Sequence, residues 1–402
     1  MTSHAVSTRR RRLGLACLTI LVGGAVLLSP PARRGYEALL LLGDVVGRPL
    51  PDALDVRPPA QRRGIAFEQD NQRYQGDLYR PEGSVRAGIV FVPGAADKGK
   101  DDPRVVNFAT ALARARFAVL VPDVVALRQL RLLPESARDI GGALSWLLAQ
   151  PELAPKGCVG LVATSVAIGP ALLALLDHRW SASVRFVVSI GGYHDLPRTL
   201  TYLTTGHYQA NGVSLEVTPK EYGKWVYALS NAIRLGNPAE REALEALARR
   251  KLLNAEADVT AELTHIGPEG KSVYEYIVNT DPARSQGLLL RLSARLRADV
   301  EALDLASRDL RVIQARFLLV HGIDDEIIPY GESIGLARAI GPGRARLVLL
   351  QGFRHVDIAP RFADGWRLWR ALSALLRERC RESPSWLLTY WNPIRATAPR
   401  YW

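Results

Sequence analysis

The sequence has few cysteines and few lysines, and it lacks the short motifs that bind cofactors. Cys17, Cys158 and Cys380 are its only cysteines in 402 residues. Three scattered cysteines exclude a zinc cluster and a disulfide framework, so we expect buried or idle thiols. There is no glycine-rich phosphate loop, nicotinamide fingerprint or metal-ligand cluster, and the sequence therefore predicts no cofactor and no metal site.

Basic residues exceed acidic ones by 52 to 40, but only 7 of the 52 are Lys. Six arginines (Arg9 to Arg12, Arg33 and Arg34) lie in the first 34 residues, which contain no acid. Half of the net charge of +12 therefore belongs to a terminal segment. No basic cluster interleaved with aromatic residues follows, so we expect no nucleic-acid partner.

The amino terminus has the pattern of an export or anchor segment. The arginines at 9–12 precede an uncharged apolar run at 13–28, and Pro30 and Pro31 interrupt a cleavage pattern near Ala32. We therefore predict that residues 1–35 form an uncleaved anchor, which is a membrane contact. The excess of arginine before the run would leave the rest of the chain outside the cytoplasm. Export followed by signal cleavage is the alternative.

The remaining chain has an ordinary globular composition, with 48% hydrophobic and 23% charged residues. Short apolar runs alternate with amphipathic stretches, which is typical of a mostly parallel sheet with helices on both faces. The expected strands are 64–70, 72–79, 87–92, 117–121, 158–163, 184–190, 315–321 and 344–350. The expected helices between them are 104–115, 134–150, 166–176, 331–340 and 360–381.

This pattern divides the chain into six parts. After the amino-terminal segment we expect a linker at 36–63, the first part of an α/β core at 64–195, a helical insertion at 196–312, the second part of the core at 313–382 and a tail at 383–402.

One strand end has the sequence Ala163-Thr164-Ser165-Val166-Ala167 and leads directly into a helix. Ligands of α/β sheets bind at the carboxyl ends of the strands, and a serine on such a sharp turn needs small residues two positions before and after it. Here the chain resembles the α/β-hydrolase superfamily, whose nucleophile elbow is usually G-x-S-x-G. Both glycines of that pattern are alanines in this sequence.

Two further strand ends extend the resemblance. Residues 321–329 (HGIDDEIIP) are similar to the acid-bearing strand end of the family, with Asp325 at the acid position and Asp324 as the alternative. His355 follows the last strand, where the family places its histidine. The order Ser165, Asp325, His355 is the family order.

A fourth strand end, Pro93-Gly94-Ala95, corresponds to the loop that contributes to the family's oxyanion hole. The family usually has His-Gly at its start, and proline stands at 93 here. The resemblance implies that the backbone N–H groups of Ala95 and Val166 are the two donors.

The resemblance implies an α/β-hydrolase fold and a serine hydrolase that cleaves a small-molecule ester or acyl substrate, with a peptide or thioester less favoured. The insertion would then be a lid. Its tyrosines and tryptophan near 193–227 either line the substrate site or, as we favour, form the core of the insertion. An inactive binding or scaffold protein at the cell envelope with the same fold is the alternative.

Overall fold

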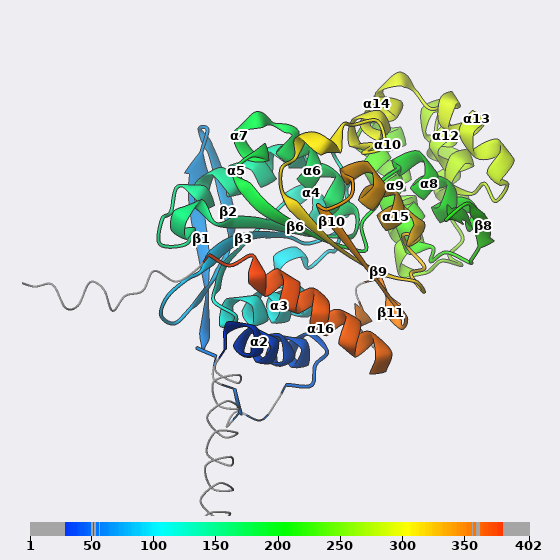
Figure 1. Ribbon diagram of the computed structural model, residues 1–402. Helices are drawn as coiled ribbons and strands as arrows, with labels where there is room; N and C mark the ends of the chain where they lie inside the picture. Colours follow the sequence, from blue (N-terminus) through cyan, green and yellow to red (C-terminus); the bar gives the residue numbers. More distant parts are fainter. Residues whose placement is uncertain are drawn as a thin grey trace, which may run out of the picture.

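The structure is a computed structural model that describes residues 29–49, 51, 54–55, 57–355, 357–358 and 362–380. Its centre is a sheet of eight strands (Figure 1). In spatial order these are β1 (Ala60–Gln69), β2 (Gln72–Pro81), β4 (Phe117–Pro122), β3 (Ala87–Val92), β5 (Val159–Thr164), β6 (Val184–Ile190), β9 (Arg316–Gly322) and β10 (Ala345–Leu350). β1 and β2 are antiparallel to their neighbours, and the strands from β4 to β10 are parallel. The predicted mostly parallel sheet is confirmed.

The central strands are buried on both faces, which explains their continuous apolar sequences. Every residue of β3 and β4 is buried. In β9 the side chains alternate between two cores: Phe317 and Leu319 belong to one, and Leu318 and Val320 to the other.

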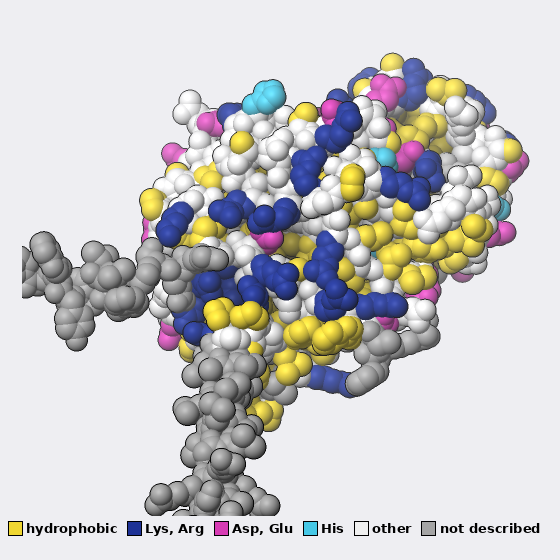
Figure 2. Space-filling view, in the orientation of Figure 1, with side chains coloured by type: hydrophobic (Ala, Val, Ile, Leu, Met, Phe, Trp, Pro, Cys, Tyr) yellow, Lys and Arg dark blue, Asp and Glu magenta, His cyan; other side chains and the backbone are white. Residues whose placement is uncertain are grey.

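Helices cover both faces, as the sequence predicts. One face packs against α5 (Ser136–Leu148), α6 (Ile168–Leu176) and α15 (Gly331–Ile340). The other packs against α2 (Pro30–Val45), α3 (Pro103–Arg114) and α16 (Phe362–Arg377). Figure 2 shows apolar side chains on the surface of this second layer, where Leu39 of α2 is 45% exposed and Trp366 of α16 is 60% exposed.

The linker expected at 36–63 is wrong over its first part, because α2 crosses the predicted boundary. Ser29 caps the helix and the two prolines occupy its first turn, where a missing N–H costs nothing. Leu40 and Leu41 are fully buried, and the indole of Trp369 on α16 donates to the carbonyl of Gly35 (2.8 Å). The apolar stripe of α2 is therefore part of the folded core.

The proposed membrane segment lies mostly outside the described residues, which begin at 29. Within the part of the chain that the structure describes, no helix has both the length and the apolar character needed to span a bilayer. The tail predicted at 383–402 also lies outside the described residues.

The region between β6 and β9 is a helical insertion, drawn in green to yellow at one end of the sheet (Figure 1). Its elements are α8 (Leu196–Thr205), β7 (His207–Ala210), β8 (Val213–Glu216), α9 (Tyr222–Ala232), α10 (Pro238–Leu253), α11 (Thr260–His265), α12 (Pro268–Ile277), α13 (Pro282–Arg291) and α14 (Ala294–Leu303). Tyr193, Tyr202, Trp225 and Tyr227 are buried in the core, as we favoured. Tyr222, in contrast, lines a cavity described below.

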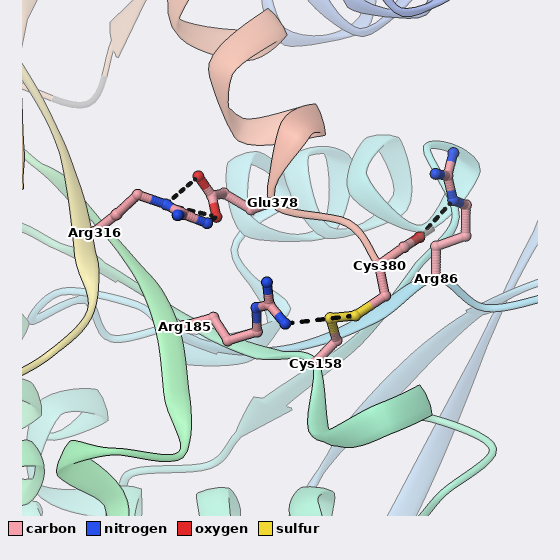
Figure 3. Close-up of a disulfide and its surroundings, with 6 residues drawn as sticks. All are labelled: Arg86, Cys158, Arg185, Arg316, Glu378 and Cys380. Carbon is pink, nitrogen blue, oxygen red and sulfur yellow. Dashed lines mark hydrogen bonds and ion pairs between the residues drawn. A yellow bond between two sulfur atoms is a disulfide. The ribbon is translucent and has the colours of Figure 1, made fainter. Parts of the chain in front are cut away.

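The expectation of unpaired thiols is wrong for two of the cysteines. Cys158, just before β5, and Cys380, after α16, form a disulfide with a Cα–Cα distance of 6.2 Å (Figure 3). The guanidinium of Arg86 donates to the carbonyl of Cys380 (3.2 Å), and Arg316 pairs with Glu378 beside it. A separation of 222 residues leaves no spacing pattern by which a sequence could reveal this pair. Cys17 lies outside the described residues.

Candidate active site

Ser165 lies on a sharp turn between β5 and α6. Its φ is 55°, a left-handed conformation that costs a non-glycine residue on the order of 1–3 kcal/mol. Ala163 and Ala167 on either side are fully buried. The loop after β3 also passes close to Ser165, because a Cβ added to Gly94 would lie 2.9 Å from Cβ of Ser165. Small residues at these positions let the serine reach the end of the sheet.

His355 follows β10 and points back at this serine. Its Nε2 lies 2.8 Å from Oγ of Ser165, and its Nδ1 lies 3.0 Å from Oδ2 of Asp325. The loop that carries it passes directly over the end of β9, where a Cβ on Gly322 would be 1.6 Å from the carbonyl oxygen of Phe353. Glycine at 322 is therefore a steric requirement of this loop.

Asp325 is buried and held from several sides. Its Oδ1 accepts hydrogen bonds from the backbone N–H groups of Ile327 (2.8 Å) and Ile328 (3.0 Å). Burial alone would raise the pKa of Asp325, but the nearby His355 and the hydrogen bonds from His321 and His355 hold that pKa below its usual range. The carboxylate is therefore ionised at neutral pH.

Of the two aspartates left open by the sequence, the structure places Asp325 against His355. Asp324 turns the other way and accepts the backbone N–H of Gly352 (2.8 Å). It thereby fixes the start of the loop that ends in His355.

His321 stands in the same motif as Asp325, and the sequence predicts no separate role for it. It is fully buried, with Nε2 2.9 Å from the carbonyl of Ile328 and Nδ1 2.7 Å from the hydroxyl of Ser333. A carbonyl can only accept, so Nε2 of His321 carries a proton and donates a hydrogen bond to the carbonyl of Ile328. Nε2 also lies 3.4 Å from Oδ2 of Asp325. The strand end and the turn after it are thus tied together around the carboxylate.

Ala95 and Val166 lie on the wall of the same cavity as Ser165. The loop of Ala95 is anchored because the N–H of Gly94 donates to the hydroxyl of Thr164 (2.8 Å). Tyr222, from the insertion, donates its hydroxyl hydrogen to the carbonyl of Ala95 (2.8 Å).

The insertion also contacts the acid-bearing loop. The hydroxyl of Tyr202 donates to the carbonyl of Asp325 (3.2 Å), and the N–H of Lys220 donates to the carbonyl of Glu326 (2.8 Å). Residues of α8, of the segment before α9 and of α9 therefore contact the loop of Asp325 and the loop of Ala95.

A cavity of about 800 Å³ opens at Ser165 and His355. Within the described ranges, no group of three His, Cys, Asp or Glu side chains is arranged to hold a metal ion. At this cavity a serine oxygen lies next to a histidine that can take its proton, with a carboxylate on the far side of the ring, an arrangement suited to nucleophilic catalysis.

Comparison with known proteins places the fold. No protein-family model matches the chain, and no curated protein matches it significantly. Among solved structures, a candidate hydrolase of Legionella pneumophila has a TM-score of 0.55 at 12% identity, covering 85% of this chain and 95% of that one. The rice cell wall degrading esterase LipA of Xanthomonas oryzae has a TM-score of 0.51 at 13% identity, covering 84% and 94%. The predicted α/β-hydrolase fold is confirmed.

Proposed function

We propose that this chain, with its α/β-hydrolase fold, is a serine hydrolase that cleaves a carboxylic ester. The observation that carries the proposal is the continuous contact from Ser165 through His355 to Asp325, with 2.8 Å and 3.0 Å between the atoms concerned. Nucleophile, base and orienting acid need this order and these distances.

In the proposed reaction, Oγ of Ser165 attacks the ester carbonyl while Nε2 of His355 takes its proton. The tetrahedral intermediate collapses, the bond to the alcohol oxygen breaks, and His355 gives the proton to the departing alcohol. A water molecule, deprotonated by His355, then attacks the acyl group on Ser165, and the acid is released with the serine restored. Asp325 holds the imidazole in place and stabilises its positive charge.

The backbone N–H groups of Ala95 and Val166 are the proposed donors to the negative oxygen of the intermediate. Each such donor contributes about 3 kcal/mol to transition-state stabilisation in comparable enzymes. The bond from Tyr222 to the carbonyl of Ala95 supports this role, because it restrains the peptide group that follows the N–H of Ala95.

Two observations favour an ester over a peptide bond. The cavity beside Ser165 is lined mainly by apolar side chains, which offer few partners to the polar backbone of a peptide. The Xanthomonas oryzae protein with the similar fold is described as an esterase.

We also propose that the chain works outside the cytoplasm, at the cell membrane or after export. The disulfide between Cys158 and Cys380 supports this location, because such bonds persist mainly in oxidising compartments. The apolar segment at the amino terminus agrees with it. A reporter fused after the tail, active only outside the cytoplasm, tests the location.

The proposed chemistry is tested by labelling the purified protein with a fluorophosphonate probe, which reacts with activated serines. We expect labelling of the wild type and of Ser214→Ala, which changes an exposed serine on β8, and none of Ser165→Ala or His355→Ala. Circular dichroism verifies that all four proteins are folded. A folded wild type that neither reacts with the probe nor hydrolyses p-nitrophenyl acetate would favour the binding or scaffold function instead.

A further inference from the structure

The cavity at Ser165 extends far below the catalytic residues, into the layer between the sheet and the helices α2, α3 and α16. Its strand-side wall includes Phe91 of β3, Val188 of β6 and Leu318 of β9. Leu318 lies four residues before Gly322, the last residue of β9, which is about 13 Å along a strand. The cavity therefore continues down the face of the sheet.

The opposite wall is formed by the first turns of α3 and by one stripe of α16. Leu368, Ala371, Leu372 and Leu375 line the cavity at positions i, i+3, i+4 and i+7, the spacing of one helix face. The stripe covers about 10 Å of helix. Ala371 lies between the leucines, and its small side chain leaves room opposite the strands.

The far end meets the carboxyl-terminal end of α2, where Asp44, Val45 and Gly47 contribute to the lining. Asp44 is held by an ion pair with Arg57 (2.9 Å). This end of the cavity is therefore formed by α2, most of which lies in the linker that the sequence predicts.

The distribution of polar groups is uneven along the cavity. The polar and charged lining residues are Asp97, Asp102, Arg104, Asn107, Thr164, Lys220 and Tyr222 together with Ser165 and His355, and Asp44 at the far end, whereas the strand and α16 walls are apolar. Protein cores contain few voids larger than a water molecule, so a space of about 800 Å³ with such walls is not ordinary packing. Its shape and chemistry fit a ligand with one polar end and a long apolar part.

We propose that this lower part of the cavity binds the alkyl chain of the acyl group, so that the substrate is a fatty acyl ester. The inference rests on the proposed function of Ser165. After the first step the acyl group remains on Ser165 while the alcohol leaves and water enters. The apolar walls of the strands and of α16 suit the part that stays, and the polar groups beside Ser165 suit the parts that exchange.

The first test is the dependence of kcat/KM on acyl-chain length, measured with p-nitrophenyl acetate, butyrate, octanoate and laurate. We expect kcat/KM to rise about fourfold for each methylene until the cavity is filled. Methyl laurate should also be a better substrate than dodecyl acetate. Equal kcat/KM for acetate and laurate, or a preference for dodecyl acetate, would overturn the inference.

A matched pair of variants on α16 locates the binding site. Ala371→Phe places a ring in the cavity, and Arg370→Phe places the same ring on the exposed face one residue earlier. We expect Ala371→Phe to lower the laurate-to-acetate ratio of kcat/KM by about tenfold or more, and Arg370→Phe to change it by less than about twofold. Ala371→Leu serves the same purpose if the larger ring prevents folding. An unchanged ratio in a folded Ala371 variant contradicts the proposal.

Binding can be measured without turnover in Ser165→Ala, using displacement of the fluorescent fatty acid 11-(dansylamino)undecanoic acid. Laurate should displace the probe and acetate should not, and Ala371→Phe in the same background should weaken probe binding. Probe binding without hydrolysis of any ester by the wild type would overturn the proposed function and with it the fatty acyl ester as substrate, and only an alkyl-chain binding site would remain. Acetate-ester hydrolysis by the wild type without probe binding would overturn only the fatty acyl specificity.

Discussion

Helices cover both faces of the sheet, but the space between sheet and helices is packed differently on the two faces. Against α5 and α6 the side chains of Ile140, Leu144, Leu172 and Leu175 are fully buried in one continuous core. Against α2, α3 and α16 the core is interrupted by the cavity below Ser165. One face is packed throughout beneath Ser165, and the other contains the cavity that opens at Ser165.

The face that contains the cavity has a hydrophobic core around it and is also held by bonds at its edges. Arg379, after α16, is buried, donates to the carbonyl of Ala115 (2.8 Å) and pairs with Glu37 of α2. The disulfide joins the same end of the chain to the start of β5. One face therefore has a continuous core, and the other contains a cavity and is held at its edge by an ion pair and a disulfide. The following predictions test this difference.

The largest effect is expected at Ser165, where the two faces meet. Ser165→Gly should lower the rate of ester hydrolysis by about 10⁴-fold to 10⁶-fold, because the nucleophile is lost. The free energy of unfolding should stay the same or rise by up to about 1 kcal/mol, since glycine adopts a φ of 55° without strain. Urea denaturation measures this free energy. A large loss of stability would mean that the packed face depends on the serine.

The next prediction concerns the disulfide at the edge of the face that contains the cavity. Cys380→Ser opens a covalent loop with a sequence separation of 222 residues, and we expect the free energy of unfolding to fall by about 4 kcal/mol. Thermal and urea denaturation of the oxidised wild type and the variant measure it. Cys17→Ser is the control for the loss of a thiol. Equal free energies of unfolding for all three proteins would show that the ion pairs hold this edge without the disulfide.

A pair of identical substitutions compares the faces directly. Leu144→Ala on α5 should lower the free energy of unfolding by about 4 kcal/mol, because it leaves a new void in a filled core. Leu372→Ala on α16 should cost about 2 kcal/mol, because that side chain already borders a cavity and loses fewer neighbours. Equal losses in urea denaturation would contradict the difference in packing.

The last prediction is a pH dependence at the junction of the packed face and the insertion. Glu332 of α15 accepts the N–H groups of His194 (3.0 Å) and Asp195 (2.7 Å), and burial raises its pKa to about 7. The protonated carboxyl is therefore favoured in the folded state. Its contribution to stability is complete below its ordinary pKa of 4.5 and is lost as pH rises towards 7.

Over this pH range the free energy of unfolding of the wild type should fall by about 2 to 3 kcal/mol relative to that of Glu332→Gln. Urea denaturation at several pH values measures both proteins. Parallel pH profiles of wild type and variant would exclude Glu332 as the titrating group.

The sheet and the helices beside it could be predicted because their sequence signals are local. β3, β6 and α15 have the predicted bounds, since continuous apolar runs and regular apolar spacing mark them. α2 could not be predicted, because its two prolines follow an apolar run and resemble the end of an anchor segment. Only its packing against α16 makes it an element of the core.

The candidate site was predictable to the extent that its residues lie in motifs. Ser165, Asp325 and His355 each follow a strand, and the structure brings them together. The choice between Asp324 and Asp325 was not predictable, because adjacent side chains point in opposite directions and only the fold decides which one meets the histidine. The cavity could not be predicted either, because its walls come from strands and helices that are far apart in the sequence.

The disulfide also has a consequence for what happens when the chain is cut. Ser165, Asp325 and His355 all lie between Cys158 and Cys380, and so does the whole insertion. A protease that cleaves one exposed loop of the insertion would leave two fragments that stay covalently joined, with the serine on one and the aspartate and histidine on the other. A nicked molecule would thus keep its full mass until a reductant separates the halves.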